Sequence, residues 1–462
     1  MPSFLRRKGV IAAIVAVLVA GAGVAVAAYL LVVKEPGNVS NPDVPFEEPT
    51  ATAPEPDPAP EKKKKKKRKE PRTVSWPRYG YTKAHTRAFQ PERPLRGPWR
   101  QVWQHKVKAL TEFPPVIWRG EIYQLIDDGL LVSLVAKTGK VRWKKRIGAL
   151  AASSPAVDDR RVYAVLLESG RGSGKGRVVA LRRKGGRTVW SKLLPGRVES
   201  SPLLHQGRVY VGSEHGTLYA FDADTGRQIW TYQAAGAIKG SPTFADGKLY
   251  IGNYGGDVQA IRASDGKLVW KSGAARGLVR SGNFYATAAV AFGRVYIGST
   301  DGRVYSFSSA NGELAWAHQT GGYVYSSAAV KNVPGLGPTV FVGSYDGTFY
   351  ALDARSGDVR WTHRAGGRIS GSPTVIGGTV YFANLASRTT IGLNTRTGKV
   401  RFRRKPGSFD PMVSDGQRLY MTGSFSLTAL EPKRAAKAEK RRKAQNAGGR
   451  KEREQRRKDR RR

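Results

Sequence analysis

The sequence predicts an all-β protein, an eight-bladed β-propeller whose last blade is completed by a strand from the N-terminal side of the domain. Three observations predict it. An aromatic residue recurs eight times at the second-strand position of a repeat, and a second aromatic follows it seven times. The chain also holds 54 glycines and 19 tyrosines, a composition that favours turn-rich β structure over a helical bundle.

The repeat unit is clearest between Gly207 and Trp230. It begins with the strand pattern Gly-Arg-Val-Tyr-Val-Gly-Ser, continues with alternating Leu-Tyr-Ala-Phe-Asp, and ends with Thr-Gly-Arg-Gln-Ile-Trp. Alternation of period two between glycine-centred turns predicts antiparallel hairpins, four strands to a unit. A repeat of about 40 residues with four strands is typical of propeller blades, because one blade cannot cover both of its own faces.

The two aromatic positions do not occur equally often. The second-strand aromatic is found at Tyr123, Tyr163, Tyr210, Tyr250, Tyr296, Phe341, Tyr381 and Tyr420. The fourth-strand aromatic follows only at Trp143, Trp190, Trp230, Trp270, Trp316, Trp361 and Phe402, while an eighth, Trp103, lies upstream of the first repeat. The strand around Trp103 should therefore complete the last blade and close the ring. We expect all eight fourth-strand aromatics to dock between blades as structural core.

An apolar N-terminal segment predicts one transmembrane helix. The 25 residues from Gly9 to Val33 carry no charge, which is enough to cross a hydrocarbon core of about 30 Å. Arg6, Arg7 and Lys8 precede this run and acidic residues follow it, so the positive-inside rule leaves the N-terminus in the cytoplasm and exports the rest. A cleaved signal peptide, whose apolar core is usually about 7–15 residues, is the alternative and would export the same domain.

Composition shifts divide the chain further. We expect a cytoplasmic N-terminus (1–8), the transmembrane helix (9–33), a disordered Pro/Lys-rich linker (34–75), the propeller (76–431) and a basic tail (432–462). The tail holds sixteen Lys/Arg against four acids and has no aromatic residue to stack on bases. On the exported side we do not expect nucleic acid as its partner. Anionic envelope material, or no partner at all, remains open.

The net charge of +44, from 79 Lys+Arg and 35 Asp+Glu, should attract polyanions without selecting among them. The positive residues of the connections between successive blades are the candidate ligand-binding residues, because these connections meet at the mouth of the central channel. They are Lys145, Arg146, Arg197, Lys239, Arg276, Arg280, Arg368, Arg404 and Lys405, and Glu199 is the conspicuous acid among them. The alternative is that so basic a chain carries Lys and Arg on every loop.

Two copies of the repeat, 220–230 and 351–361, and the Trp76-Pro77-Arg78-Tyr79-Gly80 lead-in resemble the tryptophan-docking motif of quinoprotein-type propellers. The resemblance covers roughly residues 76–431 and implies an eight-bladed propeller. Its superfamily includes dehydrogenases that use pyrroloquinoline quinone (PQQ) and non-enzymatic scaffolds such as BamB-type outer-membrane assembly factors.

The sequence departs from both kinds of relative. The dehydrogenases usually carry an adjacent cysteine pair against the cofactor and long insertions with calcium ligands. This chain has no cysteine, and 40 to 47 residues separate its successive tryptophans. BamB-type factors are anchored through a cysteine that is also missing here. We therefore expect a compact propeller with no cofactor and no metal, and PQQ with calcium is the alternative.

No catalytic residues stand out, since the six histidines are scattered over separate repeats without metal-ligand spacing. We expect a monomeric, single-pass plasma-membrane protein whose propeller lies outside the cytoplasm. Its expected function is to bind or scaffold envelope proteins or anionic cell-wall polymers without catalysis. The alternative is a PQQ-dependent dehydrogenase.

Overall fold

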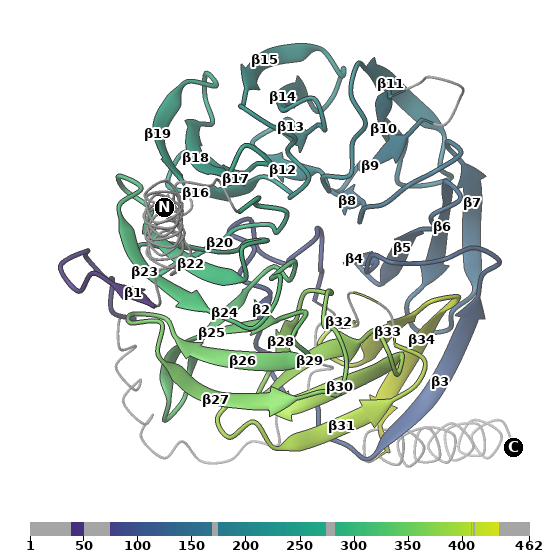
Figure 1. Cartoon of the computed structure of the whole chain (residues 1–462). Helices are drawn as coiled ribbons and strands as arrows, with labels where there is room; N and C mark the ends of the chain where they lie inside the picture. Colours follow the sequence, from purple (N-terminus) through teal and green to yellow (C-terminus); the bar gives the residue numbers. More distant parts are fainter. Residues whose placement is uncertain are drawn as a thin grey trace, which may run out of the picture.

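The computed structural model describes residues 38–49, 74–168, 174–273, 282–407, 409 and 412–433. Within them, eight sheets are arranged as a ring around a central channel (Figure 1). The predicted eight-bladed, all-β propeller is therefore confirmed. The predicted transmembrane helix 9–33 lies outside the described residues. The described part of the chain contains no helix that is long and apolar enough to cross a membrane.

Each blade has four strands, named A to D from the channel outward. Blade 1 comprises β4 (Val116–Trp118), β5 (Glu121–Leu125), β6 (Leu130–Val135) and β7 (Val141–Arg146), and blade 2 comprises β8 (Ala156–Val157), β9 (Arg161–Leu167), β10 (Gly176–Arg182) and β11 (Thr188–Leu194). Blade 3 comprises β12 (Leu203–His205), β13 (Arg208–Gly212), β14 (Thr217–Asp222) and β15 (Gln228–Gln233), and blade 4 comprises β16 (Thr243–Ala245), β17 (Lys248–Gly252), β18 (Asp257–Arg262) and β19 (Leu268–Gly273).

Blades 5 to 8 follow the same order. Blade 5 comprises β20 (Ala289–Ala291), β21 (Arg294–Gly298), β22 (Arg303–Ser308) and β23 (Leu314–Gln319), and blade 6 comprises β24 (Ala329–Val333), β25 (Gly337–Gly343), β26 (Thr348–Asp353) and β27 (Val359–Arg364). Blade 7 comprises β28 (Thr374–Ile376), β29 (Thr379–Asn384), β30 (Thr389–Asn394) and β31 (Val400–Arg404), and blade 8 comprises β32 (Met412–Ser414), β33 (Leu419–Gly423), β34 (Ser426–Pro432) and β3 (Trp99–Lys106).

Neighbouring blades are joined by one recurring contact. In blade 3 the indole N–H of Trp230 and the hydroxyl of Tyr210 both donate to the carbonyl of Ala263 in the C–D turn of blade 4, each at 3.2 Å. The indole lies flat against Gly266, where an added Cβ would meet the ring at 2.7 Å. The same indole bond, at 3.0–3.1 Å, joins Trp103 to Ala136, Trp143 to Arg183, Trp190 to Ala223, Trp270 to Ser309, Trp316 to Ala354 and Trp361 to Thr395.

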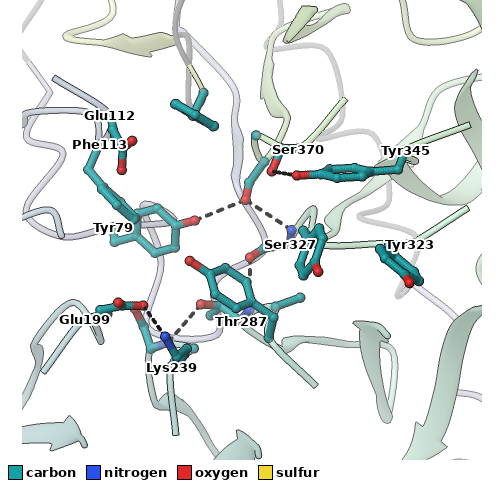
Figure 2. A pocket seen from close by; sticks show the side chains of 18 of the residues that line it. Tyr79, Glu112, Phe113, Glu199, Lys239, Thr287, Tyr323, Ser327, Tyr345 and Ser370 are labelled. Atoms are coloured by element: carbon teal, nitrogen blue, oxygen red, sulfur yellow. Dashed lines mark hydrogen bonds and ion pairs between the residues drawn. The ribbon is translucent and has the colours of Figure 1, made fainter. Parts of the chain in front are cut away.

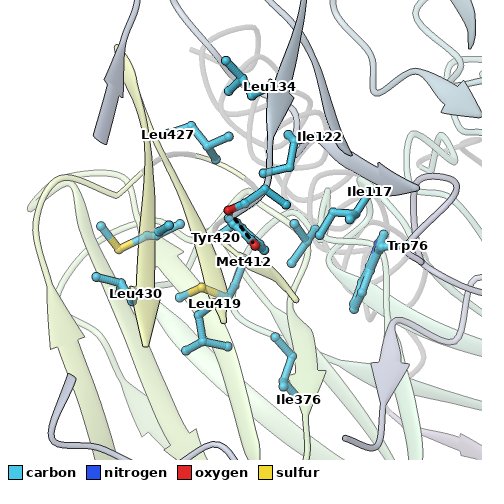
Figure 3. Packing of buried hydrophobic residues seen from close by; sticks show 14 of the residues in the cluster. Trp76, Ile117, Ile122, Leu134, Ile376, Met412, Leu419, Tyr420, Leu427 and Leu430 are labelled. Atoms are coloured by element: carbon cyan, nitrogen blue, oxygen red, sulfur yellow. Dashed lines mark hydrogen bonds between the residues drawn. The ribbon is translucent and has the colours of Figure 1, made fainter. Parts of the chain in front are cut away.

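The ring closes as predicted, by pairing the two ends of the domain. Strand β3 is antiparallel to β34, with Gln104 opposite Thr428. Trp103 of β3 and Tyr420 of β33 both donate to the carbonyl of Ala136 in blade 1. Apolar side chains of blades 7, 8 and 1 pack together beneath this contact (Figure 3).

The eighth docking aromatic, Phe402, has a different partner from the tryptophans. Strands C and D of blade 8 come from opposite ends of the domain, so no continuous C–D turn faces blade 7. The Phe402 ring instead packs edge-on against Trp99, with 6.3 Å between the ring centroids.

The turns lie on two distinct faces of the ring. Each C–D turn bonds to an A–B turn of the same blade, as Ala223 N–H does to the Gly207 carbonyl. Each D–A junction bonds instead to a B–C turn, as Ala234 N–H does to the Gly216 carbonyl. We call these the A–B/C–D face and the B–C/D–A face.

Residues 74–91, which we call the plug segment, enter the ring from the A–B/C–D face. Val74 N–H donates to the Asp415 carbonyl of blade 8, and Trp76 forms a β-bridge with Ile117 of blade 1. Its short strand β2 (Ala88–Phe89) lies parallel to β28. Carbonyls of the plug segment accept from innermost strands of five further blades, through Val157, Phe244, Val290, Val330 and Val375. The plug segment therefore occupies the channel.

Residues 38–49, which we call the strap, pack on the outside of blade 5. Strand β1 (Val39–Ser40) extends the sheet by pairing with β23, and Val44 is only 2% exposed. Arg294, 1% exposed, bonds through its guanidinium to the carbonyls of Val44 and Pro45. This corrects the expectation of a free linker over 34–75 for the strap and for 74–75. The open edge of β23 supplies backbone partners that local composition does not reveal.

The closure predicts a difference between two glycines of blade 1. Gly139 and Gly120 both have positive φ, +71° and +80°, but a Cβ on Gly139 would meet the Trp103 ring at 2.6 Å, whereas nothing lies within 4 Å of one on Gly120. Both alanine variants should lose about 1–2 kcal/mol of unfolding free energy through backbone strain. Gly139→Ala should lose about 1–3 kcal/mol more through overpacking, measured by urea unfolding. Equal losses would contradict the docking of Trp103 on blade 1.

Candidate functional site

The channel opens on the B–C/D–A face into a pocket of about 690 Å³ (Figure 2). Its walls come from the D–A junctions and from the B–C turns that carry Tyr254 and Tyr345, and Tyr79 of the plug segment also lines it. This volume is within the usual range for small-molecule and peptide side-chain sites. Because the plug segment occupies the channel from the other face, Tyr79 lies at the inner end of the pocket.

A chain of hydroxyl groups runs around the inner end of the pocket from blade to blade. The backbone N–H of Ser241 donates to Thr287 Oγ1 at 2.9 Å, and that of Thr287 to Ser327 Oγ at 3.0 Å. Ser327 N–H bonds to Ser372 Oγ at 3.1 Å, and this hydroxyl also pairs with Tyr79 at 3.1 Å. The Ser-Pro and Ser-Ser dipeptides of the repeat are therefore an inner ring of inter-blade contacts, a role that the sequence analysis did not assign.

Tyrosines form one continuous side of the pocket. The ring centroids of Tyr254 and Tyr285 are 6.3 Å apart, those of Tyr285 and Tyr325 5.3 Å, and those of Tyr325 and Tyr345 4.9 Å. Tyr323 extends the row outward and is 51% exposed. Burial raises the pKa of Tyr285 far above its usual value, so this phenol stays neutral. The row offers a broad aromatic surface with hydroxyl groups at its edge.

One lysine of the pocket wall is ion-paired, and one arginine is not. Lys239 Nζ lies 3.2 Å from Glu199 (Figure 2). It also lies 3.1 Å from Glu214. Burial alone would lower the pKa of Lys239, but these carboxylates outweigh it and raise that pKa. Burial raises the pKa of Glu199. The exposed guanidinium of Arg368 lies over the Tyr345 ring at 5.6 Å and has no carboxylate partner among the described residues.

The structure brings two of the nine predicted cations, Lys239 and Arg368, into the pocket, together with Glu199. Five of the others lie elsewhere: Arg197 faces Glu214 at 3.9 Å, Arg146 pairs with Asp128, Lys145 bonds to Thr188, Arg404 bonds to Gln101, and Lys405 is exposed outside the pocket. Arg276 and Arg280 lie outside the described residues. Ligand binding by these residues stays a prediction.

The tyrosines are the site residues that sequence reasoning missed. A signal was present, because Tyr254 and Tyr345 directly follow the Gly-Asn or Gly-Ser that ends the second strand, where blade 3 has Glu214. Tyr323 and Tyr325 stand in the junction before a Ser-Ser pair. Because tyrosines also recur in the strands of the repeat, the tyrosines of these turns and junctions did not stand out as a separate group.

The donor set of the pocket does not fit calcium-bound PQQ. Calcium takes six to eight oxygen ligands, mostly from carboxylates and carbonyls. The pocket-lining carboxylates among the described residues are Glu112 and Glu199, and Glu199 is ion-paired with Lys239. Nowhere in the described part of the chain do three or more His, Cys, Asp or Glu side chains gather closely enough to hold a metal ion.

Comparisons with known proteins agree with the observed propeller fold. The family model described as outer membrane protein assembly factor BamB matches residues 99–171, 165–333 and 326–456. The chain belongs to this family. No curated protein sequence matches it.

Among solved structures, BamB from Moraxella catarrhalis matches this BamB-family chain with a TM-score of 0.60 at 18% identity, over 72% of this chain and 99% of its own. Quinohemoprotein alcohol dehydrogenase ADHIIG from Pseudomonas putida HK5 matches with 0.66 at 14%, over 77% and 80%. The computationally designed protein Ika8 matches with 0.61 at 14%, over 72% and 99%. At such identities the likeness shows the fold alone.

Asp127, in the B–C turn of blade 1, predicts a pH-dependent stability. Burial, and then the nearby carboxylate of Glu112, raise the pKa of Asp127 from 3.8 to about 7. Between these values the folded chain holds a proton that the unfolded chain has released, so the wild type loses stability as the pH rises through that window. Asp127→Asn should raise the urea midpoint more at about pH 8 than at about pH 4.5. A gain that is the same at both pH values would refute the shifted pKa.

Proposed function

We propose that the chain is a membrane-anchored, extracytoplasmic propeller that binds or scaffolds envelope proteins or anionic envelope polymers without catalysis. The observation that carries this proposal is the tyrosine-walled pocket, in which Lys239 is ion-paired with Glu199. An ion-paired lysine and carboxylate are not poised as a general base and acid. A rigid aromatic surface at a channel mouth is better suited to holding a ligand.

Tyrosine supports protein binding on general physical grounds. Its side chain presents a large apolar area at low entropic cost and keeps a hydroxyl for hydrogen bonding, so it is enriched among residues that dominate interface energy. The exposed Tyr323 and Arg368 stand at the rim, where a partner would first make contact. The BamB family name, which describes an assembly factor, agrees with a binding role.

The membrane anchor rests on the uncharged run from Gly9 to Val33 and the cations before it. Because the chain has no cysteine, one introduced cysteine is a unique label. We expect Ser264→Cys, on an exposed C–D turn, to react with a membrane-impermeant maleimide in intact spheroplasts, with the chain in the membrane fraction. Labelling only after lysis would contradict export, and a soluble chain would contradict the anchor.

The pocket is tested by Tyr323→Ala/Tyr345→Ala. We expect this variant to lose at least about tenfold of the envelope proteins that immobilised wild-type chain retains, quantified by mass spectrometry, because two contact surfaces of the row are removed. The matched control is Phe425→Ala, which removes an equally exposed aromatic (51%) that does not line this pocket. A retained set unchanged in the tyrosine variant would exclude the pocket as the binding site.

A PQQ-dependent dehydrogenase is supported by fold likeness only, since the donor set of the pocket does not favour it. Adding PQQ and calcium to the purified chain separates the two functions. Under the scaffold proposal no cofactor absorbance stays with the protein after gel filtration. Stoichiometric bound PQQ would overturn it.

A further inference from the structure

The plug segment leaves one blade without a backbone contact. Among the described residues its backbone bonds to the other seven blades, as the Lys83 carbonyl does to the Phe244 N–H of blade 4. The equivalent N–H of blade 3 belongs to Leu204, by the register of β12 with β13, and it has no acceptor on the described plug segment. Residues 78–82 form bends and turns at this point. A gap in the backbone contacts is thus left at the inner edge of β12.

Three basic side chains gather at this gap, namely Arg78, Lys83 and His205, which we call the basic cluster. Lys83 Nζ lies 2.8 Å from His205 Nδ1. An ammonium group only donates, so Nδ1 accepts and Nε2 carries the proton of the neutral imidazole. Burial, and then the charges of Lys83, Arg78 and Arg208, lower the pKa of His205. Burial, and then the charge of Arg78, lower the pKa of Lys83 as well. The three side chains are therefore close enough to disfavour one another's positive charge.

Arg78 has few partners for a charged side chain. Among the described residues its guanidinium makes one hydrogen bond, of 3.4 Å to the Tyr81 carbonyl, and its buried Nε–H has no acceptor. Burial lowers the pKa of Arg78 from 12.5 to about 10, so the group stays charged at neutral pH. A buried charge without a counter-charge is unfavourable. An anion beside Arg78 would therefore stabilise the folded chain.

No acid in the described part of the chain compensates the basic cluster. No carboxylate contributes to the pKa shift of any of its three members. Other cations of the A–B/C–D face do pair with acids, as Arg183 does with Glu121 and Arg161 with Asp224. The basic cluster thus differs from its surroundings, and the missing counter-charge points to an anionic ligand.

The basic cluster adjoins a groove of about 820 Å³ between the A–B turns of blades 3 and 4. His205 and Phe244, from the innermost strands of these blades, line the groove with their rings 3.7 Å apart between centroids. Lys83 Nζ lies 5.8 Å from the centroid of the Phe244 ring. The other charged residues that line the groove are Arg208, Lys248, Arg262 and one acid, Asp246. The groove is therefore basic, and it leads inward to the basic cluster.

We propose that the basic cluster binds the phosphate group of a small ligand whose remainder lies in this groove. The groups left without acceptors all donate, namely the Arg78 guanidinium, the Lys83 ammonium, His205 Nε2–H and Leu204 N–H. A phosphate monoester brings close to two negative charges and three acceptor oxygens, whereas a carboxylate brings one charge. This inference goes beyond the proposed function, since none of these residues lines the tyrosine pocket.

The test is isothermal titration calorimetry of the full-length chain in detergent, with inorganic phosphate and glycerol phosphate as probes. We expect either probe to bind saturably. Lys83→Met should weaken both at least about tenfold, because it removes a charge-assisted hydrogen bond but keeps the backbone carbonyl that bonds to blade 4. The matched control is Lys331→Met, which removes a lysine of blade 6 that contacts the plug segment at Gln90. The control should lose less than about twofold.

Arg78→Met separates binding from folding. It should also weaken glycerol phosphate binding at least about tenfold. Without phosphate it should not lower the urea midpoint, because the charge that it removes is uncompensated. A lower midpoint together with unchanged affinity would assign Arg78 to the fold alone and overturn the proposal.

Absence of saturable phosphate binding, or equal losses in Lys83→Met and Lys331→Met, would likewise overturn it. Acetate bound as tightly as phosphate would assign the basic cluster to carboxylates instead. Binding of inorganic phosphate with exclusion of glycerol phosphate would overturn the placement of a larger ligand in the groove. Tyr323→Ala/Tyr345→Ala should leave phosphate affinity unchanged, so this proposal and the proposed function can fail independently.

Discussion

The structure depends on one contact, in which the aromatic pair of a blade docks on a single turn carbonyl of the next blade. Tyr210 and Trp230 share the Ala263 carbonyl, and the indole packs against a glycine that has no side chain to displace it. No blade can satisfy this contact alone, because donor and acceptor belong to different repeats. Each such contact therefore requires a neighbouring blade, and the placement of β3 in the last blade supplies blade 1 as the neighbour for Trp103 and Tyr420.

This constraint leaves ligand binding to the turns. The strand interiors are committed to docking, and the inner ends of the blades to the hydroxyl chain from Ser241 to Ser372. The plug segment occupies the channel between the two faces, so the faces have separate chemistry. One face carries the aromatic pocket, and the other carries the A–B and C–D turns and the entry of the plug segment.

The repeat could be predicted from the sequence because its aromatic residues are regularly spaced. The unequal counts of the two positions even located the closing strand at Trp103, whose docking on Ala136 the structure confirms. The strap could not be predicted, since Asn38–Pro49 has no strand pattern and gains its partners only from the edge of β23 and from buried Arg294. The sequence analysis predicted that cations of the blade junctions converge at the channel mouth, but it did not predict that several of them pair with acids, for a similar reason. Whether Arg146 meets Asp128 depends on which turns share a face, and local sequence does not encode this.

The account depends most directly on the pairing of β3 with β34, and a cysteine pair measures it. Gln104 and Thr428 lie opposite each other, with Gln104 Nε2 3.2 Å from Thr428 Oγ1. In a chain without other cysteines, Gln104→Cys/Thr428→Cys should form an intramolecular disulfide on mild oxidation, seen as a cross-linked peptide by mass spectrometry. Two free thiols in the folded, oxidised variant would show that the N-terminal strand does not complete the last blade.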